Sequence, residues 1–364
     1  MPSFTLSVAA SVVRQAGDAT TMWLIGAGIA VIAAAVFALL LVVVLRERRG
    51  RREETRAQSP PVRNNPSRSP GISFTRREDA HDEITQPLPV AIRPRANTSS
   101  VVGFRAAART DKGRVRSINE DDTLLAELTD DAGSVHTGLY AVADGVGGQD
   151  KGEVASKTAI EATIAALQAH PFFAEGLYRD DEIADDTVLD VLRDSVAGAN
   201  RAVYSVKVEQ RSDLATTLVL ALVLRGKAYI ANVGDSRAYL LRDDRFRQIT
   251  EDHTAVERMV AMGQITVAEA RQHPQRNVIF RSLGTYPQIE VDLFVEELEP
   301  GDRLLLCSDG LTGMIPDEAL MHIARNEADL DKACRMMVRA ANEAGGTDNI
   351  SVVLAEVLET EPGS

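Results

Sequence analysis

Two apolar segments of the sequence each end in an aspartate followed directly by glycine. Residues 140–143 (Tyr-Ala-Val-Ala) lead into Asp144 and Gly145, and residues 304–307 (Leu-Leu-Leu-Cys) lead through a serine into Asp309 and a further glycine. Each segment is typical of a buried strand that delivers a carboxylate at its tip, where glycine lets the backbone turn and approach a ligand closely. Such a carboxylate is costly unless a cation or a hydrogen-bond network compensates it. A single Asp-Gly pair is more typical of a turn, so the chemical interpretation depends on further acids.

Further acidic residues stand at the borders of other segments. Asp348 comes just before the apolar run 350–354, and the pair Glu120 and Asp121 follows Arg116. Several acids without histidine or cysteine indicate a hard cation, and oxygen ligands with retained water suit Mg²⁺ or Mn²⁺ rather than Zn²⁺. Two such ions that share a carboxylate, about 3.5–4 Å apart, would lower the pKa of a bridging water and hold the oxygens of a phosphoryl group. The acids therefore predict metal-assisted phosphoryl chemistry.

The composition limits the classes of protein that could carry such a site. The chain has 364 residues, of which 45% are hydrophobic and 26% charged, so at least one folded domain is expected. The net charge of −13 is unevenly spread, since residues 1–103 carry +5 and the remainder carries −18. A domain this acidic is not a nucleic-acid binder by charge. Cys307 and Cys334 are too few for a disulfide scaffold and fit a reducing compartment.

Residues 22–45 form an uninterrupted run of 24 residues without a charged side chain. As a helix the run would be about 36 Å long, enough to cross ~30 Å of hydrocarbon with some tilt. The alternatives are a buried core helix, which would carry polar interruptions, and a cleaved signal peptide, which has a basic leader and a shorter apolar stretch. Only Arg14 precedes the run, whereas five arginines lie between residues 46 and 52. This positive flank predicts a single-pass cell-membrane protein with a cytoplasmic main domain and a short extracytoplasmic N-terminus, residues 1–21.

Residues 46–103 have a different composition from the rest of the chain. They contain seven of its fourteen prolines, mixed with Arg, Ser, Asn and Gln and with almost no apolar periodicity. This composition predicts a disordered linker whose end-to-end distance is on the order of 40 Å or more. The arginines at its start could be a topology signal alone or could also contact anionic lipids, and the topology signal is sufficient to account for them. Residues 359–364 are expected to be a short tail.

Residues 104–358 are enough for one large domain. Short β-rich runs recur at residues 136–143, 216–224, 228–233, 238–241, 303–307 and 350–357, with helical patterns at residues 153–169, 187–210, 255–262, 267–272 and 331–344. Strands that meet through a short turn, as around residues 233–237, indicate antiparallel pairing. The helical patterns fall in separate blocks and do not alternate strand by strand. This order favours an α+β fold with helices covering sheets over a doubly wound fold.

Residues 110–121, Thr-Asp-Lys-Gly-Arg-Val-Arg-Ser-Ile-Asn-Glu-Asp, resemble the opening motif of the metal-dependent PPM/PP2C-type Ser/Thr protein phosphatases, in their bacterial form. Later runs resemble that family's further motifs in order, at residues 142–148, 214–218, 232–237, 250–254, 281–284, 306–311 and 346–352. The resemblance covers essentially all of the predicted domain and none of the first hundred residues. It implies two antiparallel β-sheets packed face to face with helices on both outer faces, preceded here by the predicted transmembrane helix.

The resemblance also implies ligands for the metal ions. Asp144 resembles the carboxylate that bridges two ions, with the Gly145 carbonyl on one of them. Asp309 and Asp348 resemble ligands of the first metal. The cofactors implied are two Mn²⁺ or Mg²⁺ ions, with a third, weaker one.

Other residues match the second-metal side and the phosphate contact of the family. Glu120 and Asp121 resemble ligands of the second metal, directly or through water. Arg116 is similar to the family's phosphate-binding arginine, and a planar guanidinium suits bidentate contact with phosphate oxygens. Asp252 resembles the acid that bacterial members use, near Asp309, for the third metal.

The sequence departs from the family pattern at two positions. Many eukaryotic members place a histidine after the Asp-Gly pair and use it as the leaving-group acid, but here that position is Val146. The proton must then come from a metal-bound water or another side chain. Ala215 stands where the family commonly has glycine, a small change that is expected to be tolerated. Residues 252–284 resemble the mobile flap near the substrate entrance of bacterial members.

Three residues near these motifs have simpler interpretations. Asp235 is expected to hold a hairpin turn rather than a metal, and His253 is expected to be a hydrogen-bonded structural residue rather than a catalytic acid. Cys307 lies on an apolar strand and is typical of a core residue. The Cys-x5-Arg spacing of tyrosine phosphatases is absent, since Gly313 and Ala340 stand six residues after the two cysteines. A cysteinyl-phosphate mechanism is therefore rejected.

These features together predict a membrane-anchored protein phosphatase. It would hydrolyse phosphoserine and phosphothreonine by direct attack of a metal-bridged water or hydroxide, with phosphorylated proteins, a Ser/Thr kinase and that kinase's substrates as partners. One alternative is a non-catalytic, membrane-tethered regulator that binds phosphoproteins with the same fold. The presence of Asp144, Asp309 and Asp348 argues against it. Another is an enzyme of the same family with a small-molecule phosphate as substrate.

Overall fold

The computed structural model describes residues 91–92, 103–130, 135–147, 151–174, 183–270 and 272–359. The predicted N-terminal segment, the predicted membrane span, most of the predicted linker and residues 360–364 lie outside them. Among the described residues, no helix combines the length and the apolar character that a membrane span requires. Two residues of the predicted linker form a short strand, β1 (Ala91–Ile92), which runs parallel to Thr129 and Asp130.

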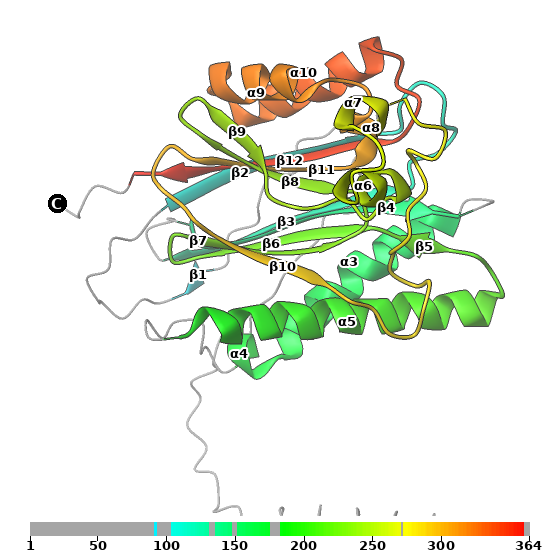
Figure 1. The fold of residues 1–364 in the computed structure, drawn as a ribbon. Helices are drawn as coiled ribbons and strands as arrows, with labels where there is room; N and C mark the ends of the chain where they lie inside the picture. Colours follow the sequence, from blue (N-terminus) through cyan, green and yellow to red (C-terminus); the bar gives the residue numbers. More distant parts are fainter. Residues whose placement is uncertain are drawn as a thin grey trace, which may run out of the picture. The chain divides into compact units, whose positions relative to one another are not determined.

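Two sheets form the centre of the domain (Figure 1). The first has the strand order β1-β3-β4-β6-β7-β10, with β5 paired to β4, and the second has the order β2-β12-β11-β8-β9. Apart from the β1–β3 pair, the strand pairs are antiparallel. The strands are β2 (Gly103–Asp111), β3 (Asp121–Asp130), β4 (Val135–Val146), β5 (Ala215–Thr216), β6 (Leu218–Leu224), β7 (Lys227–Val233), β8 (Arg237–Arg242), β9 (Arg245–Gln248), β10 (Asp292–Glu297), β11 (Arg303–Cys307) and β12 (Ile350–Leu358).

The two sheets pack face to face around a buried apolar layer. Successive side chains of a strand point to opposite faces, and β6 shows the consequence because all its residues are buried. Val219, Ala221 and Val223 pack in one cluster with Leu304 and Val353 of the second sheet. The alternate leucines of β6 pack in a second cluster with the helices on the outside.

Helices cover the outer face of each sheet (Figure 1). Two long helices, α3 and α5, pack on the first sheet, and α9 and α10 pack on the second. This arrangement confirms the prediction of two antiparallel sheets packed face to face with helices on both outer faces. The helices are α3 (Lys151–Ala169), α4 (Pro171–Ala174), α5 (Asp185–Gln210), α6 (Ala255–Ala261), α7 (Val267–Ala270), α8 (Asp309–Thr312), α9 (Asp317–Asn326) and α10 (Leu330–Glu343).

The short turn between β7 and β8 is not a hairpin. β7 ends at Val233 and pairs with β6 and β10 in the first sheet, whereas β8 begins at Arg237 and pairs with β11 and β9 in the second. The antiparallel pairing predicted across this turn is therefore wrong. Stacked sheets lie about 10 Å apart, a distance that the few residues of the turn can span. The turn instead carries the chain from one sheet to the other.

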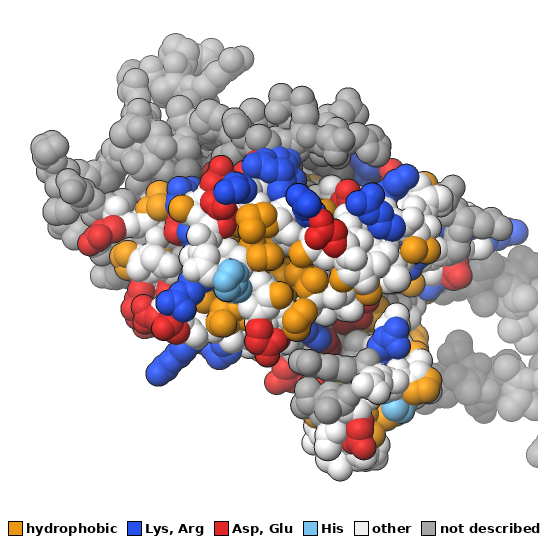
Figure 2. All heavy atoms as spheres, turned by 90° about the horizontal axis from the view of Figure 1, so that it is seen from above, with side chains coloured by type: hydrophobic (Ala, Val, Ile, Leu, Met, Phe, Trp, Pro, Cys, Tyr) orange, Lys and Arg blue, Asp and Glu red, His pale blue; other side chains and the backbone are white. Residues whose placement is uncertain are grey.

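The helical cover of the second sheet buries both cysteines. Cys334 of α10 and Cys307 of β11 belong to one apolar cluster with residues such as Leu320 and Met337. Figure 2 shows the face over α9 and α10, where hydrophobic side chains lie among charged ones. Burial raises the pKa of the Cys307 thiol to about 12, so the thiolate needed for nucleophilic attack is disfavoured at neutral pH. The prediction that Cys307 is a core residue is confirmed.

Candidate metal centre

The strand register brings acids from both sheets to one end of the sandwich. Asp121 at the start of β3 is the direct partner of Asp144 near the end of β4, and such partners have Cβ atoms about 4.5–5.5 Å apart. Both lie an even number of residues from Leu125 and Val142, which pack between the sheets, so both side chains point into the space between the sheets. In the second sheet the end of β11 adjoins the start of β12. Asp309 and Asp348 are therefore delivered to neighbouring positions.

A serine joins the acids of the two sheets. The Ser308 hydroxyl accepts a hydrogen bond of 2.9 Å from the Ser351 backbone N–H and donates one of 2.8 Å to Asp121 Oδ2. Asp121 is only 7% exposed, and its other oxygen, Oδ1, has no hydrogen-bond partner among the described residues. One end of this carboxylate is therefore fixed, and the other remains available for a cation.

The backbone of Asp144 is held by two threonines that the sequence analysis did not single out. Its N–H donates to Thr217 Oγ1 at 3.0 Å, and its carbonyl accepts from the Thr216 hydroxyl at 2.9 Å and from the Thr217 N–H at 2.8 Å. The next residue, Gly145, donates its N–H to the Glu120 carbonyl. A Cβ at Gly145 would lie 2.1 Å from the Gly152 carbonyl oxygen, so only glycine fits there. The matched motifs at residues 142–148 and 214–218 thus serve to position one carboxylate.

Asn349 fixes the loop that carries Glu120 and Arg116. Its side-chain carbonyl accepts from the Glu120 N–H at 2.8 Å, and its amide donates to the Lys112 and Ile118 carbonyls. The Glu120 carboxylate accepts from the Gly152 N–H at 3.1 Å. Asn349 was missed as a positioning residue, although it stands next to the predicted ligand Asp348.

Arg116 lies beside the acids with an exposed guanidinium group. Its Nη2 donates to Asp348 Oδ2 at 2.8 Å, and its Nη1 lies 3.7 Å from Glu120 Oε2. The hydrogen bond to Asp348 raises the pKa of Arg116. Its side chain is 46% exposed, so the guanidinium can reach both the acidic cluster and an anion from solvent.

The acids repel one another in this position. Burial raises the pKa of Asp121 to about 7, with hydrogen bonds from serine opposing the rise and Asp309 and Asp348 adding to it. Burial also raises the pKa of Asp144 well above its usual value, and Asp121, Asp309 and Asp235 increase the effect. For Asp309 the pKa is raised by burial first and then by Asp348. A divalent cation would relieve this accumulated negative charge.

Asp235 belongs to the same acidic cluster. It is 5% exposed, its Oδ1 has no hydrogen-bond partner among the described residues, and it lies in the turn that crosses between the sheets. Burial and the charge of Asp309 raise the pKa of Asp235 well above its usual value. The hairpin role that the sequence suggested does not hold, because its flanking strands are not paired. An inter-sheet turn with a buried acid was not distinguishable from a hairpin in the sequence.

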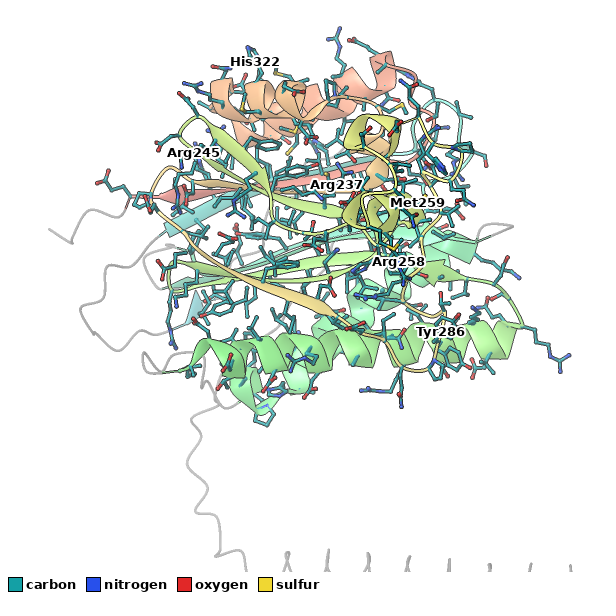
Figure 3. The ribbon with its side chains drawn as sticks, viewed as in Figure 1. Arg237, Arg245, Arg258, Met259, Tyr286 and His322 are labelled. Carbon is teal, nitrogen blue, oxygen red and sulfur yellow. The ribbon has the colours of Figure 1, made fainter. Side chains whose placement is uncertain are left out.

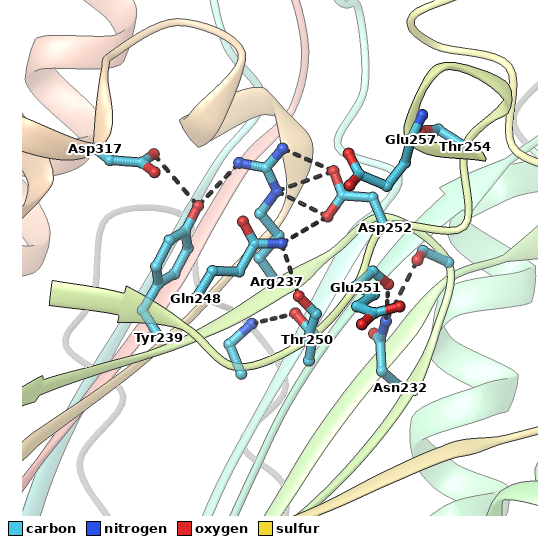
Figure 4. Close-up of polar contacts among 12 residues, drawn as sticks. Asn232, Arg237, Tyr239, Gln248, Thr250, Glu251, Asp252, Thr254, Glu257 and Asp317 are labelled. Atoms are coloured by element: carbon cyan, nitrogen blue, oxygen red, sulfur yellow. Dashed lines mark hydrogen bonds and ion pairs between the residues drawn. The ribbon is translucent and has the colours of Figure 1, made fainter. Parts of the chain in front are cut away.

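Asp252, which the family resemblance suggested as a ligand of the third metal, is bound by an arginine (Figure 4). Arg237 Nε donates to both of its carboxylate oxygens at 2.9 and 3.0 Å, and Nη2 donates to Oδ2 at 2.7 Å. Gln248 adds a bond of 3.0 Å to Oδ1. Burial alone would lower the pKa of Arg237, but Asp252 reverses the effect and raises it. The charge of Arg237 also opposes the rise that burial causes in the pKa of Glu257 on α6, the helix that carries Arg258 and Met259 (Figure 3).

The residues present fit a hydrated divalent ion. Within the described ranges, no three Asp, Glu, His or Cys side chains close around one point as a protein-only ligand set. Mg²⁺ usually keeps several waters and binds through one or two carboxylates. The free oxygens of Asp121 and Asp235, both buried, are the acceptors such an ion requires. Structurally, then, these acids suit Mg²⁺ or Mn²⁺ held partly through water.

The fold and this acidic site define a metal-dependent phosphatase of the protein phosphatase 2C class. The chain belongs to that family: the family model for protein phosphatase 2C matches residues 112–359. The serine/threonine phosphatase stp of Listeria monocytogenes serotype 4b is 37% identical over 263 residues, which are 71% of this chain and 98% of that protein. PstP of Mycobacterium tuberculosis is 38% identical over 265 residues, 71% of this chain and 46% of PstP.

Solved structures show the same similarity. The crystal structure of M. tuberculosis PstP/Ppp has a TM-score of 0.59 and 36% identity, and the match covers 71% of this chain and all of that one. The structure of the PstP catalytic domain in complex with two manganese ions has a TM-score of 0.57 and 34% identity, with 71% of this chain and 99% of that one covered. As in the family, the cofactors of this chain are Mn²⁺ or Mg²⁺ ions.

The raised pKa values predict how metal binding and pH combine. Because Asp121, Asp144 and Asp309 titrate above their unfolded values, the metal-free folded chain holds protons that the unfolded chain has lost between about pH 4 and pH 7. Its stability should therefore fall as pH rises through this window. Mn²⁺ at 100 times its Kd should add about 2.7 kcal/mol, or roughly 5–11 °C in Tm.

The measurement is thermal unfolding of the full chain with and without Mn²⁺ at pH 5 and pH 8, with chelator added to reverse the effect. The rise in Tm caused by Mn²⁺ should be larger at pH 8, where the ion does not compete with protons. An equal or larger rise at pH 5 would contradict the assignment of these acids.

Proposed function

We propose that this chain hydrolyses phosphoserine and phosphothreonine in proteins by direct attack of water, without a covalent enzyme intermediate. The observation that carries the proposal is the convergence of Asp121, Asp144 and Asp309 from both sheets beside the exposed guanidinium of Arg116. No thiol competes for the role of nucleophile among the described residues, because Cys307 and Cys334 are both buried.

The acids of the cluster have different roles in this proposal. Asp144 would bridge two ions, Asp309 and Asp348 would hold the first, and Glu120 and Asp121 would hold the second directly or through water. When bound, Mn²⁺ or Mg²⁺ supplies Lewis-acid activation of water and neutralisation of phosphoryl charge. Ser308 fixes one carboxylate oxygen of Asp121, and Thr217 fixes the backbone of Asp144, so little reorganisation is needed during the reaction.

Arg116 orients the phosphoryl group. Its planar guanidinium can bind two phosphoryl oxygens at once, and its bond to Asp348 holds it at the edge of the cluster. Val146, 45% exposed beside Asp144, has no proton to give, so a different donor protonates the leaving hydroxyl group of the substrate.

We assign Asp235 rather than Asp252, together with Asp309, as a ligand of the weaker third ion. Asp235 has a buried oxygen without a partner, whereas both oxygens of Asp252 accept hydrogen bonds from Arg237. An ion at Asp252 would have to displace a bidentate, partly buried guanidinium. The contacts therefore support a different residue from the one that the family resemblance suggested.

We also propose that residues 22–45 anchor the chain in the cell membrane, that residues 46–103 include a flexible tether, and that the catalytic domain is cytoplasmic. The support is the uncharged run of 24 residues and the arginines that follow it. The physiological substrates would then be phosphorylated proteins near the membrane, including targets of a Ser/Thr kinase. A non-catalytic regulator has less support, because the acids of the cluster are retained.

Replacement of Asp144 by asparagine should remove nearly all activity, because the shared ligand of two ions loses its charge. The expected loss in kcat is about 100-fold or more, equivalent to about 2.7 kcal/mol of transition-state stabilisation. The assay is Mn²⁺-dependent release of phosphate from a phosphothreonine peptide by the full chain. Asp190→Asn, at an exposed acid of α5, is the matched control and should retain activity. Full turnover by a folded Asp144→Asn variant would refute the proposal.

Asp235→Asn and Asp252→Asn should differ in what they change. Asp235→Asn should raise the Mn²⁺ concentration for half-activation by about tenfold, equivalent to 1.4 kcal/mol, with little loss of Tm. Asp252→Asn should lower the stability by about 3 kcal/mol because it leaves Arg237 without its counter-charge. Mn²⁺ titration and thermal unfolding of both variants separate these effects. The opposite pattern would return the third ion to Asp252.

The membrane anchor predicts that the full chain stays in the membrane fraction after alkaline carbonate extraction. Ala33→Arg with Ala34→Arg should release it, since each central arginine costs about 2.5–3.5 kcal/mol of insertion. Ser59→Arg with Ser67→Arg adds the same charge in the proposed tether and should leave the chain membrane-bound. Release of the unmodified chain by carbonate would count against the anchor.

A further inference from the structure

Both imidazole nitrogens of His253 have partners in the protein. The side chain is 4% exposed. Nδ1 lies 2.9 Å from the Gly234 backbone nitrogen, and Nε2 lies 2.9 Å from Asp292 Oδ2 and 2.9 Å from Arg281 Nη1. The sequence predicted a hydrogen-bonded structural residue here, and these contacts are more specific than that prediction.

The contacts assign one tautomer. Because the Gly234 N–H donates to Nδ1, that nitrogen carries no proton, and the proton lies on Nε2. Nε2–H then donates to Asp292 Oδ2. With the proton on Nε2, this nitrogen cannot accept a hydrogen bond from Arg281 Nη1, which donates to the other oxygen of Asp292 at 2.6 Å.

His253 holds the turn that carries Asp235. Its own backbone N–H donates to the Gly234 carbonyl at 3.0 Å, so both polar backbone groups of Gly234 are bound by one residue. Gly234 has φ +116°, and a Cβ there would lie 2.6 Å from Thr217 side-chain atoms. Thr217 also binds the Asp144 N–H. The turn is therefore packed directly against Thr217, the residue that holds the backbone of Asp144.

The other side of His253 faces the segment between α6 and β10. Phe280 N–H donates to the His253 carbonyl at 2.9 Å, and the two rings have centroids 5.7 Å apart. Asp292, which accepts from Nε2, is the first residue of β10 and pairs with Asn232 of β7. The imidazole thus connects a fixed strand end with the backbone of Gly234.

We propose that His253 is a positioning residue that acts through the Gly234 amide to hold Asp235 toward Asp309. It thereby sets the affinity of the acidic cluster for its weakest divalent ion. Asp252, the adjacent residue, has a different task, since it neutralises Arg237 at the start of β8. This inference rests on the proposed role of Asp235 as a ligand.

Two substitutions of His253 distinguish the contact of Nδ1 with Gly234 from the contact of Nε2 with Asp292. In His253→Asn, Oδ1 is as many bonds from the backbone as Nδ1 is, so the acceptor for Gly234 remains while the Asp292 contact is lost. In His253→Gln, the amide can reach toward Asp292, but no acceptor remains at the δ position. Asp292→Asn is the matched control, because it weakens the Nε2 contact and leaves the imidazole in place.

The first readout is hydrogen exchange of the Gly234 amide in the metal-free full chain. His253→Gln should speed this exchange by about tenfold or more, whereas His253→Asn and Asp292→Asn should stay within about threefold of the unmodified chain. The second readout is calorimetric Mn²⁺ binding. His253→Gln should weaken the Mn²⁺ affinity of the weakest site by about tenfold, and His253→Asn should keep that affinity within about twofold of the unmodified chain.

Equal effects of His253→Asn and His253→Gln on both readouts would overturn the proposal. If His253→Gln does not fold, nitrogen NMR of the unmodified chain decides, because a proton on Nδ1 instead of Nε2 contradicts the acceptor role. A chain that binds no Mn²⁺ at all would refute the proposed function, whereas the exchange and NMR results would still test the contact with Gly234.

Discussion

Several carboxylates at the end of the sandwich are brought together with too little positive charge to balance them. Asp121 and Asp144 are register partners, and the ends of β11 and β12 add Asp309 and Asp348. Arg116 binds one of these acids from the solvent side. Burial and mutual repulsion favour the protonated forms of Asp121, Asp144 and Asp309, and protonated acids are poor metal ligands. Divalent cations resolve this conflict, and the motifs shared with the protein phosphatase 2C family are largely the means of holding the oxygens for them.

Asp252 and Asp235 have opposite environments. Asp252 receives a guanidinium from within the chain and becomes part of the support of β8. Asp235, seventeen residues earlier, is left with a buried oxygen that no described residue satisfies. An acid with its own arginine stabilises the fold without metal, whereas an acid without one depends on a ligand from solvent. His253 is linked to both acids, since it follows Asp252 in sequence and contacts the turn that carries Asp235.

The sequence predicted the layered fold and most of the acids that the structure brings to one end of the sandwich, because both depend on short patterns. Apolar runs ending in Asp-Gly marked the tips of β4 and β11, and the order of motifs identified the family. Sequence patterns missed features that depend on which sheet a strand joins. The turn at residues 233–237 reads as a hairpin until the partners of β7 and β8 are known. The roles of Asn349, Thr217 and Ser308 are likewise set by contacts between segments far apart in the chain. The predicted membrane span lies outside the described residues and stays a prediction.

The central claim is that divalent ions bind between the two sheets at the shared carboxylate of Asp144. X-ray diffraction from crystals of the chain grown with millimolar Mn²⁺, recorded at the manganese absorption edge, locates such ions directly. The account predicts anomalous peaks with an oxygen of Asp144 at roughly the 2.0–2.6 Å typical of hard divalent cations, and with Asp252 still paired to Arg237. Manganese found only at other acids, with no peak beside Asp144, would contradict it.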